Sequence, residues 1–199
     1  MVKKFIEEYG TQNTAEGRFA LLYKEIVRES LKNGWGNPFA NDHAPEILMA
    51  NALGHKIGKQ KQGADALDEN GEDVEYKKTS NQSVQGTYNG VSIHQTWKEQ
   101  VEGRPATLGV RKRKGIRDKT LHAKFHFIGI LLKDRYEYEI IYRLSGEDVH
   151  NILLPKFEES YNNKKNRADQ RLGAILNEKE IKKYGTIVYT RKQGLLRTN

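Results

Sequence analysis

Two apolar segments near the middle of the chain constrain its fold more than any other feature. KFHFIGILL (residues 124–132) and YEYEIIYRL (residues 136–144) are separated only by the polar residues 133–135. Short segments of this composition, joined by such a brief connection, are typical of a β-hairpin. The first segment is apolar enough to lie in the centre of a sheet. GTIVY (residues 185–189) predicts a further strand near the end of the chain.

The N-terminal part of the chain predicts two helices. Residues 15–31 place four apolar side chains on one stripe at helical spacing, and residues 33–34 (Asn-Gly) are a typical helix end. The stripe consists of Phe19, Leu22, Ile26 and Val27. A second, shorter helix is expected through residues 47–53, with Asp42 as its cap.

The elements together predict a single domain. NQSVQGTYNG (residues 81–90) is polar and rich in turn residues, which predicts an exposed loop. No internal repeat or domain boundary interrupts the chain. We therefore expect one α/β (α+β) domain over residues 1–199, with a mixed central β-sheet flanked by helices. Its helical region would comprise residues 1–55, and its sheet-containing core residues 56–199.

Composition and charge limit the classes of function. The 199 residues include no cysteine, which excludes disulfides and thiolate metal sites. No segment approaches the ~18 apolar residues of a membrane span, and the N-terminus lacks the apolar core of a signal peptide, so a cytoplasmic protein without membrane contact is expected. The formal net charge of +8 predicts a polyanionic partner such as nucleic acid. Charge alone does not separate a nuclease from a ribosomal protein, a repressor or a basic enzyme.

Carboxylates are concentrated in GADALDENGEDVEYKKTS (residues 63–80), which predicts a second hairpin. Its strands would be residues 64–68 and 72–79. Residues 69–71 would form a three-residue loop, with Gly71 in the left-handed conformation that such a loop requires.

This register brings three functional groups together. It places Asp65 opposite Glu75, and strand alternation puts Lys77 on the same face as Glu75. Val74 and Tyr76 then face the other way. A two-residue loop would instead place Tyr76 opposite Asp65 and separate the carboxylates.

Two carboxylates and an amine on one face suit phosphodiester hydrolysis. Mg²⁺ prefers a few carboxylate oxygens together with water and phosphate oxygens, and a neighbouring lysine can orient the attacking water. The alternative is a charged hairpin tip with cross-strand ion pairs. The Glu-x-Lys spacing alone does not decide, because it recurs in Glu180-Ile181-Lys182, where the surrounding sequence has helical spacing.

The same residues carry a family resemblance. Asp65, nine intervening residues and Glu75-Tyr76-Lys77 resemble the signature of the PD-(D/E)xK nucleases, and residues 63–80 are similar to the catalytic hairpin of PvuII-like type II restriction endonucleases. The segments 92–97, 140–149 and 184–189 resemble later parts of that fold. The chain departs from the pattern by having Ala64 where the signature has proline.

The resemblance implies a set of roles. Asp65 and Glu75 would hold Mg²⁺, and Lys77 would position or activate water. Cleavage of double-stranded DNA would leave 5′-phosphate and 3′-hydroxyl ends. His94 would be all that remains of a base-reading histidine cluster. A pair of base-contacting asparagines would correspond either to Asn162-Asn163 or to Asn177.

Further residues are candidates for DNA contact. Two basic segments could bind the phosphate backbone, which fixes register without reading sequence. The first contributes Lys112, Arg113, Lys114 and Arg117, and the second contributes Lys164, Lys165, Arg167 and Arg171. His122 and His126 are interpreted as packing or surface residues. Glu46, on the second helix, is a candidate carboxylate or an ordinary surface residue, and Gln62 and Lys78 could line the site.

The sequence thus favours a Mg²⁺-dependent type II restriction endonuclease from a prokaryotic cytoplasm. Cleavage of both strands at a palindrome calls for two related active sites, so a homodimer is expected. Residues 15–31 would supply the dimer contacts or would pack on their own core. Two alternatives remain at this point: a repair or recombination nuclease of the same fold, and a non-catalytic DNA-binding protein.

Overall fold

The computed structural model describes residues 14–39, 43–57, 64–80, 83–92, 96–106, 114–132, 136–164 and 171–196. The chain divides into two compact units, which are Met1–Ala44 with Lys59–Gln62 and Pro45–Gly58 with Gly63–Asn199. The second unit contains the sheets and the predicted catalytic hairpin. Each unit is considered by itself.

The described part of the first unit is built on α2 (Ala15–Lys32), the helix predicted for residues 15–31. The Thr14 side chain caps the N-terminus of this helix. Asn33 and the left-handed Gly34 end the helix, as the sequence predicts. The predicted apolar stripe is largely exposed, with exposed fractions of 69% for Phe19, 53% for Leu22 and 49% for Ile26. These side chains therefore do not form a buried core.

Helix α3 (His43–Leu53) confirms the shorter predicted helix, although its expected cap, Asp42, lies outside the described residues. Met49 and Ala50 are buried in the core of the second unit. Glu46 lies in the first turn of this helix.

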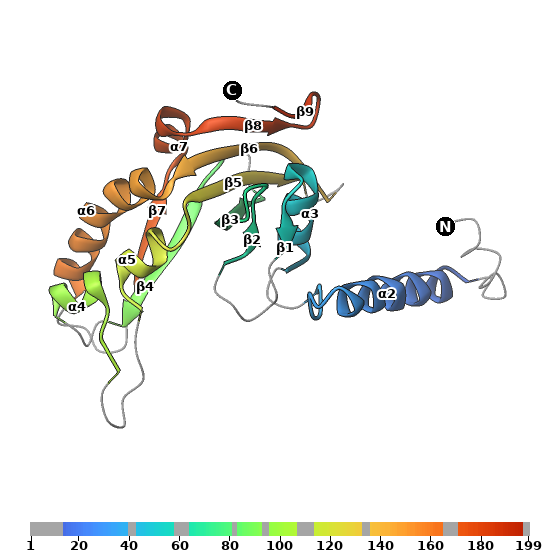
Figure 1. Cartoon of the computed structure of the whole chain (residues 1–199), viewed down its shortest axis with the longest axis horizontal. Coiled ribbons are helices and arrows are strands. Elements are labelled where there is room, and N and C mark those ends of the chain that lie inside the picture. Colours follow the sequence, from blue (N-terminus) through green and yellow to red (C-terminus); the bar gives the residue numbers. More distant parts are fainter. Residues whose placement is uncertain are drawn as a thin grey trace. The chain divides into compact units, whose positions relative to one another are not determined.

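The second unit is organised around a mixed sheet with the strand order β1-β2-β3-β5-β6-β8-β9. The strands are β1 (Lys56–Ile57), β2 (Ala66–Leu67), β3 (Asp73–Thr79), β5 (Phe125–Leu132), β6 (Glu137–Ser145), β8 (Thr186–Thr190) and β9 (Gly194–Leu195). The β5–β6 hairpin predicted from the apolar segments is confirmed, and so is the strand predicted at the end of the chain. Only the β3–β5 pairing in this sheet is parallel among the described strands. Figure 1 shows the long strands β5 and β6 curling across the centre of the sheet.

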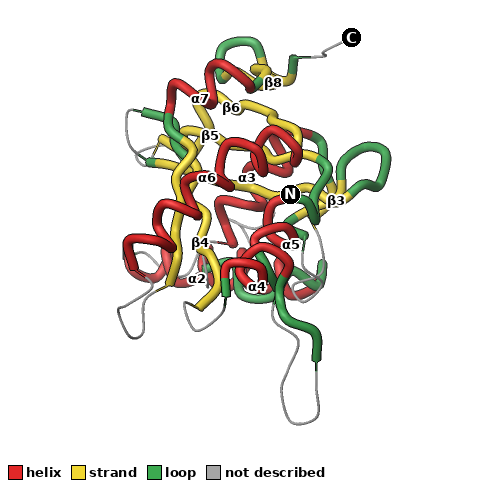
Figure 2. The backbone as a smooth tube through the Cα atoms, turned by 90° about the vertical axis from the view of Figure 1, so that its left-hand side faces the viewer, coloured by secondary structure: helices red, strands yellow, loops and turns green. Residues whose placement is uncertain are grey.

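A second, two-stranded sheet pairs β4 (Gly86–Ser92) with β7 (Arg171–Leu176). The prediction of an exposed loop over residues 81–90 is therefore wrong for the described residues from 86 onward. Val84 and Tyr88 are buried, because a partner strand distant in sequence gives this polar segment a face to bury. Figure 2 shows β4 extending along helix α6 (Gly146–Lys164), which packs on β7. The remaining helices are α4 (Trp97–Glu102), α5 (Ile116–Thr120) and α7 (Glu178–Tyr184).

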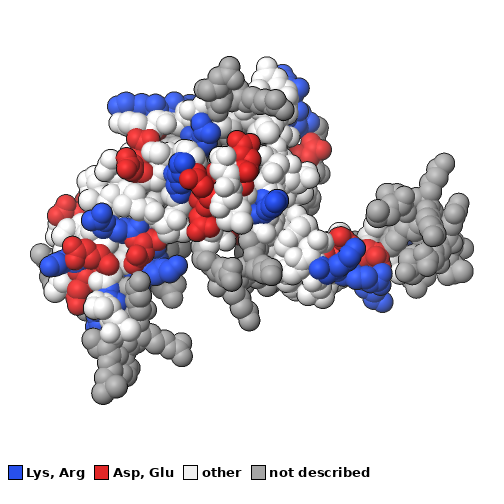
Figure 3. Space-filling model, viewed as in Figure 1, with Lys and Arg blue, Asp and Glu red and all other residues white. Residues whose placement is uncertain are grey.

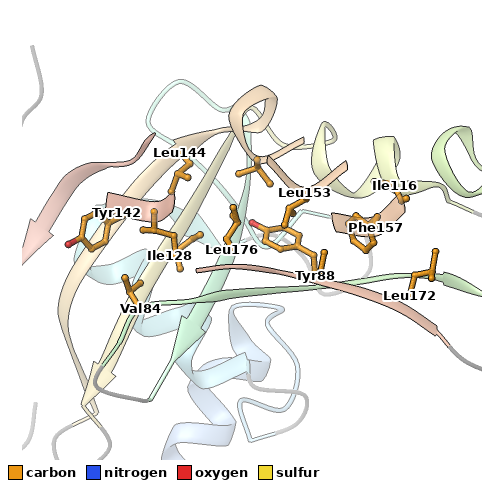
Figure 4. Close-up of a cluster of buried hydrophobic side chains, with 13 residues drawn as sticks. Val84, Tyr88, Ile116, Ile128, Tyr142, Leu144, Leu153, Phe157, Leu172 and Leu176 are labelled. Atoms are coloured by element: carbon orange, nitrogen blue, oxygen red, sulfur yellow. The ribbon is translucent and has the colours of Figure 1, made fainter. Parts of the chain in front are cut away.

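The hydrophobic core has two parts, one on each face of the main sheet. The first part joins β4, β7 and α6 to β5 and β6, with Tyr88, Ile128, Leu153 and Phe157 among its members (Figure 4). The second part joins α3 to the opposite face and includes Phe127. Strand β5 contributes alternate residues to both parts, which explains why its sequence is apolar almost throughout.

These elements form a mixed α+β fold with a curled central sheet flanked by helices, as the sequence predicts at the level of fold class. Among the described helices, none combines the length and the apolar character required to cross a membrane.

Close packing at Gly129, in the middle of β5, yields a stability prediction. A Cβ atom at this position would lie 2.6 Å from Cδ1 of Tyr138, whose ring is 3% exposed. Gly129→Ala should therefore lower the free energy of unfolding by about 1–3 kcal/mol, because a buried ring must shift to admit the methyl group. Urea unfolding of both proteins measures the difference.

Gly173 provides the matched control, because the nearest atoms to a Cβ there lie 3.7 and 3.8 Å away. Gly173→Ala should leave the free energy of unfolding close to that of the wild type. Equal losses in the two variants would contradict the packing argument.

Candidate active site

The hairpin of β2 and β3 adopts the predicted register. Ala66 pairs with Val74 and Leu67 pairs with Asp73. Residues 69–71 form the loop, and Gly71 has a φ of 79°. The Asp68 carboxylate accepts hydrogen bonds from backbone N–H groups across the turn, at 2.8 and 2.9 Å. This register confirms the three-residue loop and excludes the two-residue alternative.

The register brings the three predicted catalytic residues to one place. The Asp65 carboxylate accepts a hydrogen bond from the Tyr76 backbone N–H at 2.7 Å, which ties it to β3. Val74 and Tyr76 belong to the part of the core that contains α3. Glu75 and Lys77 therefore lie on the opposite face of β3, where their side chains are 16% and 22% exposed. Lys77 Nζ donates hydrogen bonds to Glu75 Oε1 and to the carbonyl of Tyr76.

The two carboxylates differ in their protonation. Burial, and next the charge of Glu75, raise the pKa of Asp65 to about 7, although the hydrogen bond from Tyr76 opposes this. Burial would also raise the pKa of Glu75, but hydrogen bonds from His122 and Lys77 lower it to about 2. Glu75 is thus a stable anion, and a second negative charge on Asp65 is unfavourable until a positive charge accompanies it.

His122 is a residue that sequence reasoning missed. The interpretation of this histidine as a packing or surface residue is wrong, because its Nε2 lies 3.0 Å from Glu75 Oε2. The hydrogen bond to Glu75 raises the pKa of His122, although burial opposes the shift. The two residues are 47 positions apart in sequence, so no local spacing could have indicated the contact.

His126, by contrast, is a buried structural residue, as predicted. Its Nε2 lies 2.9 Å from the carbonyl oxygen of Thr120 and its Nδ1 lies 3.0 Å from the Tyr88 hydroxyl. Because a carbonyl only accepts, Nε2 carries the proton and Nδ1 accepts from Tyr88. Burial lowers the pKa of His126 to about 4, so the ring is neutral at ordinary pH. This pair of bonds fixes α5 and β4 against β5.

A pocket of about 320 Å³ lies beside Glu75 and Lys77. It is lined by Glu75, Lys77, Thr87, Tyr88, Asn89, Lys114, Asp118, Lys119 and His122. The predicted phosphate contact Lys114 therefore lies next to Glu75 and Lys77, and Lys119 lines the same pocket. Lys119 Nζ donates to the carbonyl of Asn89, which links α5 to β4. A larger cavity, of about 490 Å³, contains neither Glu75 nor Lys77.

The other predicted DNA contacts are not brought to this pocket within the described residues. Arg117 is exposed on α5, and Asn162 and Asn163 are exposed in the last turn of α6, where Lys164 ends the helix. His94, Lys112, Arg113, Lys165, Arg167 and Gln62 lie outside the described residues, and the Arg171 and Lys164 side chains are likewise not described. Figure 3 shows acidic and basic side chains interspersed on one face, without a continuous basic surface among the coloured residues.

Asn177, the other candidate for a base-contacting asparagine, is the N-cap of α7. Its side chain accepts a hydrogen bond from the Glu180 backbone N–H at 3.1 Å and caps α7. The second Glu-x-Lys sequence lies in this helix, as its spacing predicts.

The donor set fits a magnesium ion. Asp65 and Glu75 offer hard carboxylate oxygens, and Glu46 is close enough for its charge to raise the pKa of Asp65. In the described ranges, no three His, Cys, Asp or Glu side chains gather in a metal-binding group. Mg²⁺ does not require such a cage, because one or two carboxylates with water and substrate phosphate suffice.

No model of a known protein family and no curated protein matches this sequence. The geometry of the site therefore carries the functional assignment.

The raised pKa of Asp65 yields a pH-dependent prediction for the protein in EDTA. The native state holds the Asp65 proton up to about pH 7, whereas the ordinary pKa is 3.8, so ionisation of Asp65 destabilises the fold as the pH rises. Asp65→Asn retains the acceptor for the Tyr76 N–H and removes this cost. Relative to the wild type, the variant should gain up to about 2–3 kcal/mol in free energy of unfolding between pH 5 and pH 8.

Urea unfolding at the two pH values measures this gain. Asp73→Asn, at an exposed position of the same hairpin, is the matched control. If the free energy of unfolding of Asp65→Asn rose no more than that of the control, the charge of Glu75 would not disfavour the ionisation of Asp65.

Proposed function

We propose that this protein is a Mg²⁺-dependent type II restriction endonuclease of the PD-(D/E)xK class. It would act in a prokaryotic cytoplasm and cleave double-stranded DNA to give 5′-phosphate and 3′-hydroxyl ends. The observation that carries the proposal is that Glu75 and Lys77 share one largely enclosed face of β3, with Asp65 bonded to the same strand, beside a pocket lined with lysines.

Burial argues against the alternative of a solvated charged turn. Glu69 and Asn70, at the tip of the hairpin, are exposed, as such a turn predicts. Glu75 and Lys77 are instead largely enclosed, although enclosing charged groups costs free energy. Strongly shifted pKa values in a pocket are typical of functional sites, and those of Asp65 and Glu75 are shifted in opposite directions.

Each group has a role that follows from its position. Asp65 and Glu75 would hold Mg²⁺, which when bound supplies positive charge to the scissile phosphate. Lys77 presents an ammonium group fixed by Glu75 and the Tyr76 carbonyl, so its remaining N–H can orient the attacking water. Lys114 and Lys119 would bind backbone phosphate near the cut, which positions the duplex without reading its sequence.

Replacement of Lys77 tests the catalytic assignment. Lys77→Ala should reduce cleavage by ~10³-fold or more, because it removes a group that acts on the reacting atoms, while DNA binding persists. Cleavage is measured by incubating plasmid and viral DNA with the protein, with and without Mg²⁺, and separating the products on a gel.

The chain contains its own control. Lys182→Ala alters the second Glu-x-Lys sequence at an exposed position of α7 and should leave cleavage unchanged. Near-normal cutting by Lys77→Ala would exclude its role. Sharp Mg²⁺-dependent bands from the wild type support a restriction enzyme, and cutting governed by DNA structure would indicate a repair nuclease. Binding that is indifferent to Mg²⁺, with no cutting, would indicate a DNA-binding protein.

We further propose that the enzyme acts as a homodimer, with α2 as the contact surface. Two related active sites would match the twofold symmetry of a palindrome. The supporting observation is the exposed apolar stripe of Phe19, Leu22 and Ile26, since exposed contiguous apolar side chains are typical of association surfaces.

Charge placed on this stripe should separate the subunits. Wild-type protein should have twice the 22.9 kDa mass of the chain by light scattering, and Leu22→Glu combined with Ile26→Glu should have the mass of one chain. Lys24→Glu, exposed on the same helix, should remain dimeric. A wild type of single-chain mass at micromolar concentration would exclude the proposed surface.

A further inference from the structure

The position of His122 is fixed by the elements on either side of it. Helix α5 ends at Thr120, and Leu121 caps it by donating to the carbonyl of Arg117 at 2.8 Å. Lys124 then donates its backbone N–H to the carbonyl of Asp73 at 3.2 Å, at the start of β3. The short connection that carries His122 is therefore held at both ends, and its length brings the imidazole to Glu75.

His122 completes the hydrogen bonding of Glu75. Lys77 donates a hydrogen bond to Oε1 of Glu75, and Nε2 of His122 lies 3.0 Å from Oε2 of the same carboxylate. A carboxylate held at one oxygen can still turn about its terminal bond, because that torsion has a broad energy profile. Donors on both oxygens, from two different elements, fix the plane of the group. Each oxygen retains a further lone pair that can bind a cation.

The support for His122 continues into the core. Its ring lies edge-on to that of His126, with centroids 6.2 Å apart. His126 is in turn held by Tyr88 and by the carbonyl of Thr120. Side chains that orient a metal-binding carboxylate are effective when they are packed against fixed neighbours, and the ring beside His122 is fixed by these two bonds.

We propose that His122 is a positioning residue that fixes the Glu75 carboxylate in the orientation that binds the metal ion. This inference rests on the proposed function, and it assigns to the site a fourth residue that the Asp-Glu-x-Lys spacing does not contain. The requirement is for an N–H donor at the position of Nε2, and the imidazole ring itself is not required.

Two substitutions separate the donor from the ring. His122→Leu keeps a side chain of moderate size but no donor, whereas His122→Gln places an amide N–H near the position of Nε2. His122→Leu should bind Mg²⁺ 10- to 100-fold more weakly and cleave DNA more slowly by a similar factor. His122→Gln should remain within about threefold of the wild type in both measurements, on the same reasoning that only the donor matters.

The affinity is measured by titrating Mg²⁺ alone into the free protein in a calorimeter, and cleavage is measured on plasmid DNA. Thermal unfolding in EDTA provides a check on folding: His122→Leu should melt at a lower temperature than the wild type, because Glu75 loses a hydrogen bond, but both variants should be fully folded at the assay temperature. A loss of affinity confined to His122→Leu, in protein that is folded at the assay temperature, supports positioning of Glu75.

Three outcomes would overturn the inference. If the wild type cuts DNA and His122→Leu matches it, His122 has no role and the proposed function stands. If both variants are equally impaired, the donor alone is not what matters. If the wild type neither binds Mg²⁺ nor cuts DNA, the proposed function fails and the role of His122 fails with it.

Discussion

The site depends on the parallel pairing of β3 with β5. This pairing sets Glu75 beside His126 and Lys77 beside Ile128, on the face that also receives β4. The connection that leads into β5 must then pass the start of β3, which is how His122 reaches Glu75. A parallel pair requires a long crossover, and this crossover contains β4 and α5, whose residues line the pocket. One pairing thus determines both the face that carries Glu75 and Lys77 and the elements that enclose it.

The electrostatics of the site follow from that enclosure. Two carboxylates share a partly buried space, and Lys77 and His122 each donate a hydrogen bond to Glu75. Asp65 receives one backbone N–H, and burial and the neighbouring charge outweigh it. The negative charge of Asp65 is therefore the less well stabilised of the two. The proposed Mg²⁺ would supply positive charge beside it, and natural proteins often retain destabilising arrangements where activity requires them.

Sequence reasoning succeeded where the determinants are local. The loop length and the left-handed Gly71 fix the register of the hairpin, so the convergence of Asp65 with Glu75 and Lys77 could be predicted. The central hairpin and helix α2 were predictable from composition and periodicity. Cap chemistry is local as well, since Asn177 three residues before Glu180 is a capping-box pattern that marks the start of α7.

The failures involve contacts between distant segments. Strand β4 is a polar sequence that becomes a strand because β7, which is distant in sequence, supplies its partner. His122 enters the site through the β3–β5 register, which neither strand encodes by itself. The same dependence explains why the fold class follows from the sequence, whereas the lining of the pocket does not.

The two Glu-x-Lys sequences show how the backbone decides between a site and a surface. On α7, positions two apart point in different directions, so Lys182 pairs with Glu178 at 2.6 Å, and Glu180 pairs with Lys156 at 2.6 Å. On β3 the same interval returns to the same face, so Lys77 binds Glu75. Only the strand pair also faces a carboxylate from a neighbouring strand and a histidine from the crossover. The proposed chemistry therefore depends on the extended conformation of β3 and on its two neighbouring strands. The Glu-x-Lys spacing brings the two side chains together only in that conformation.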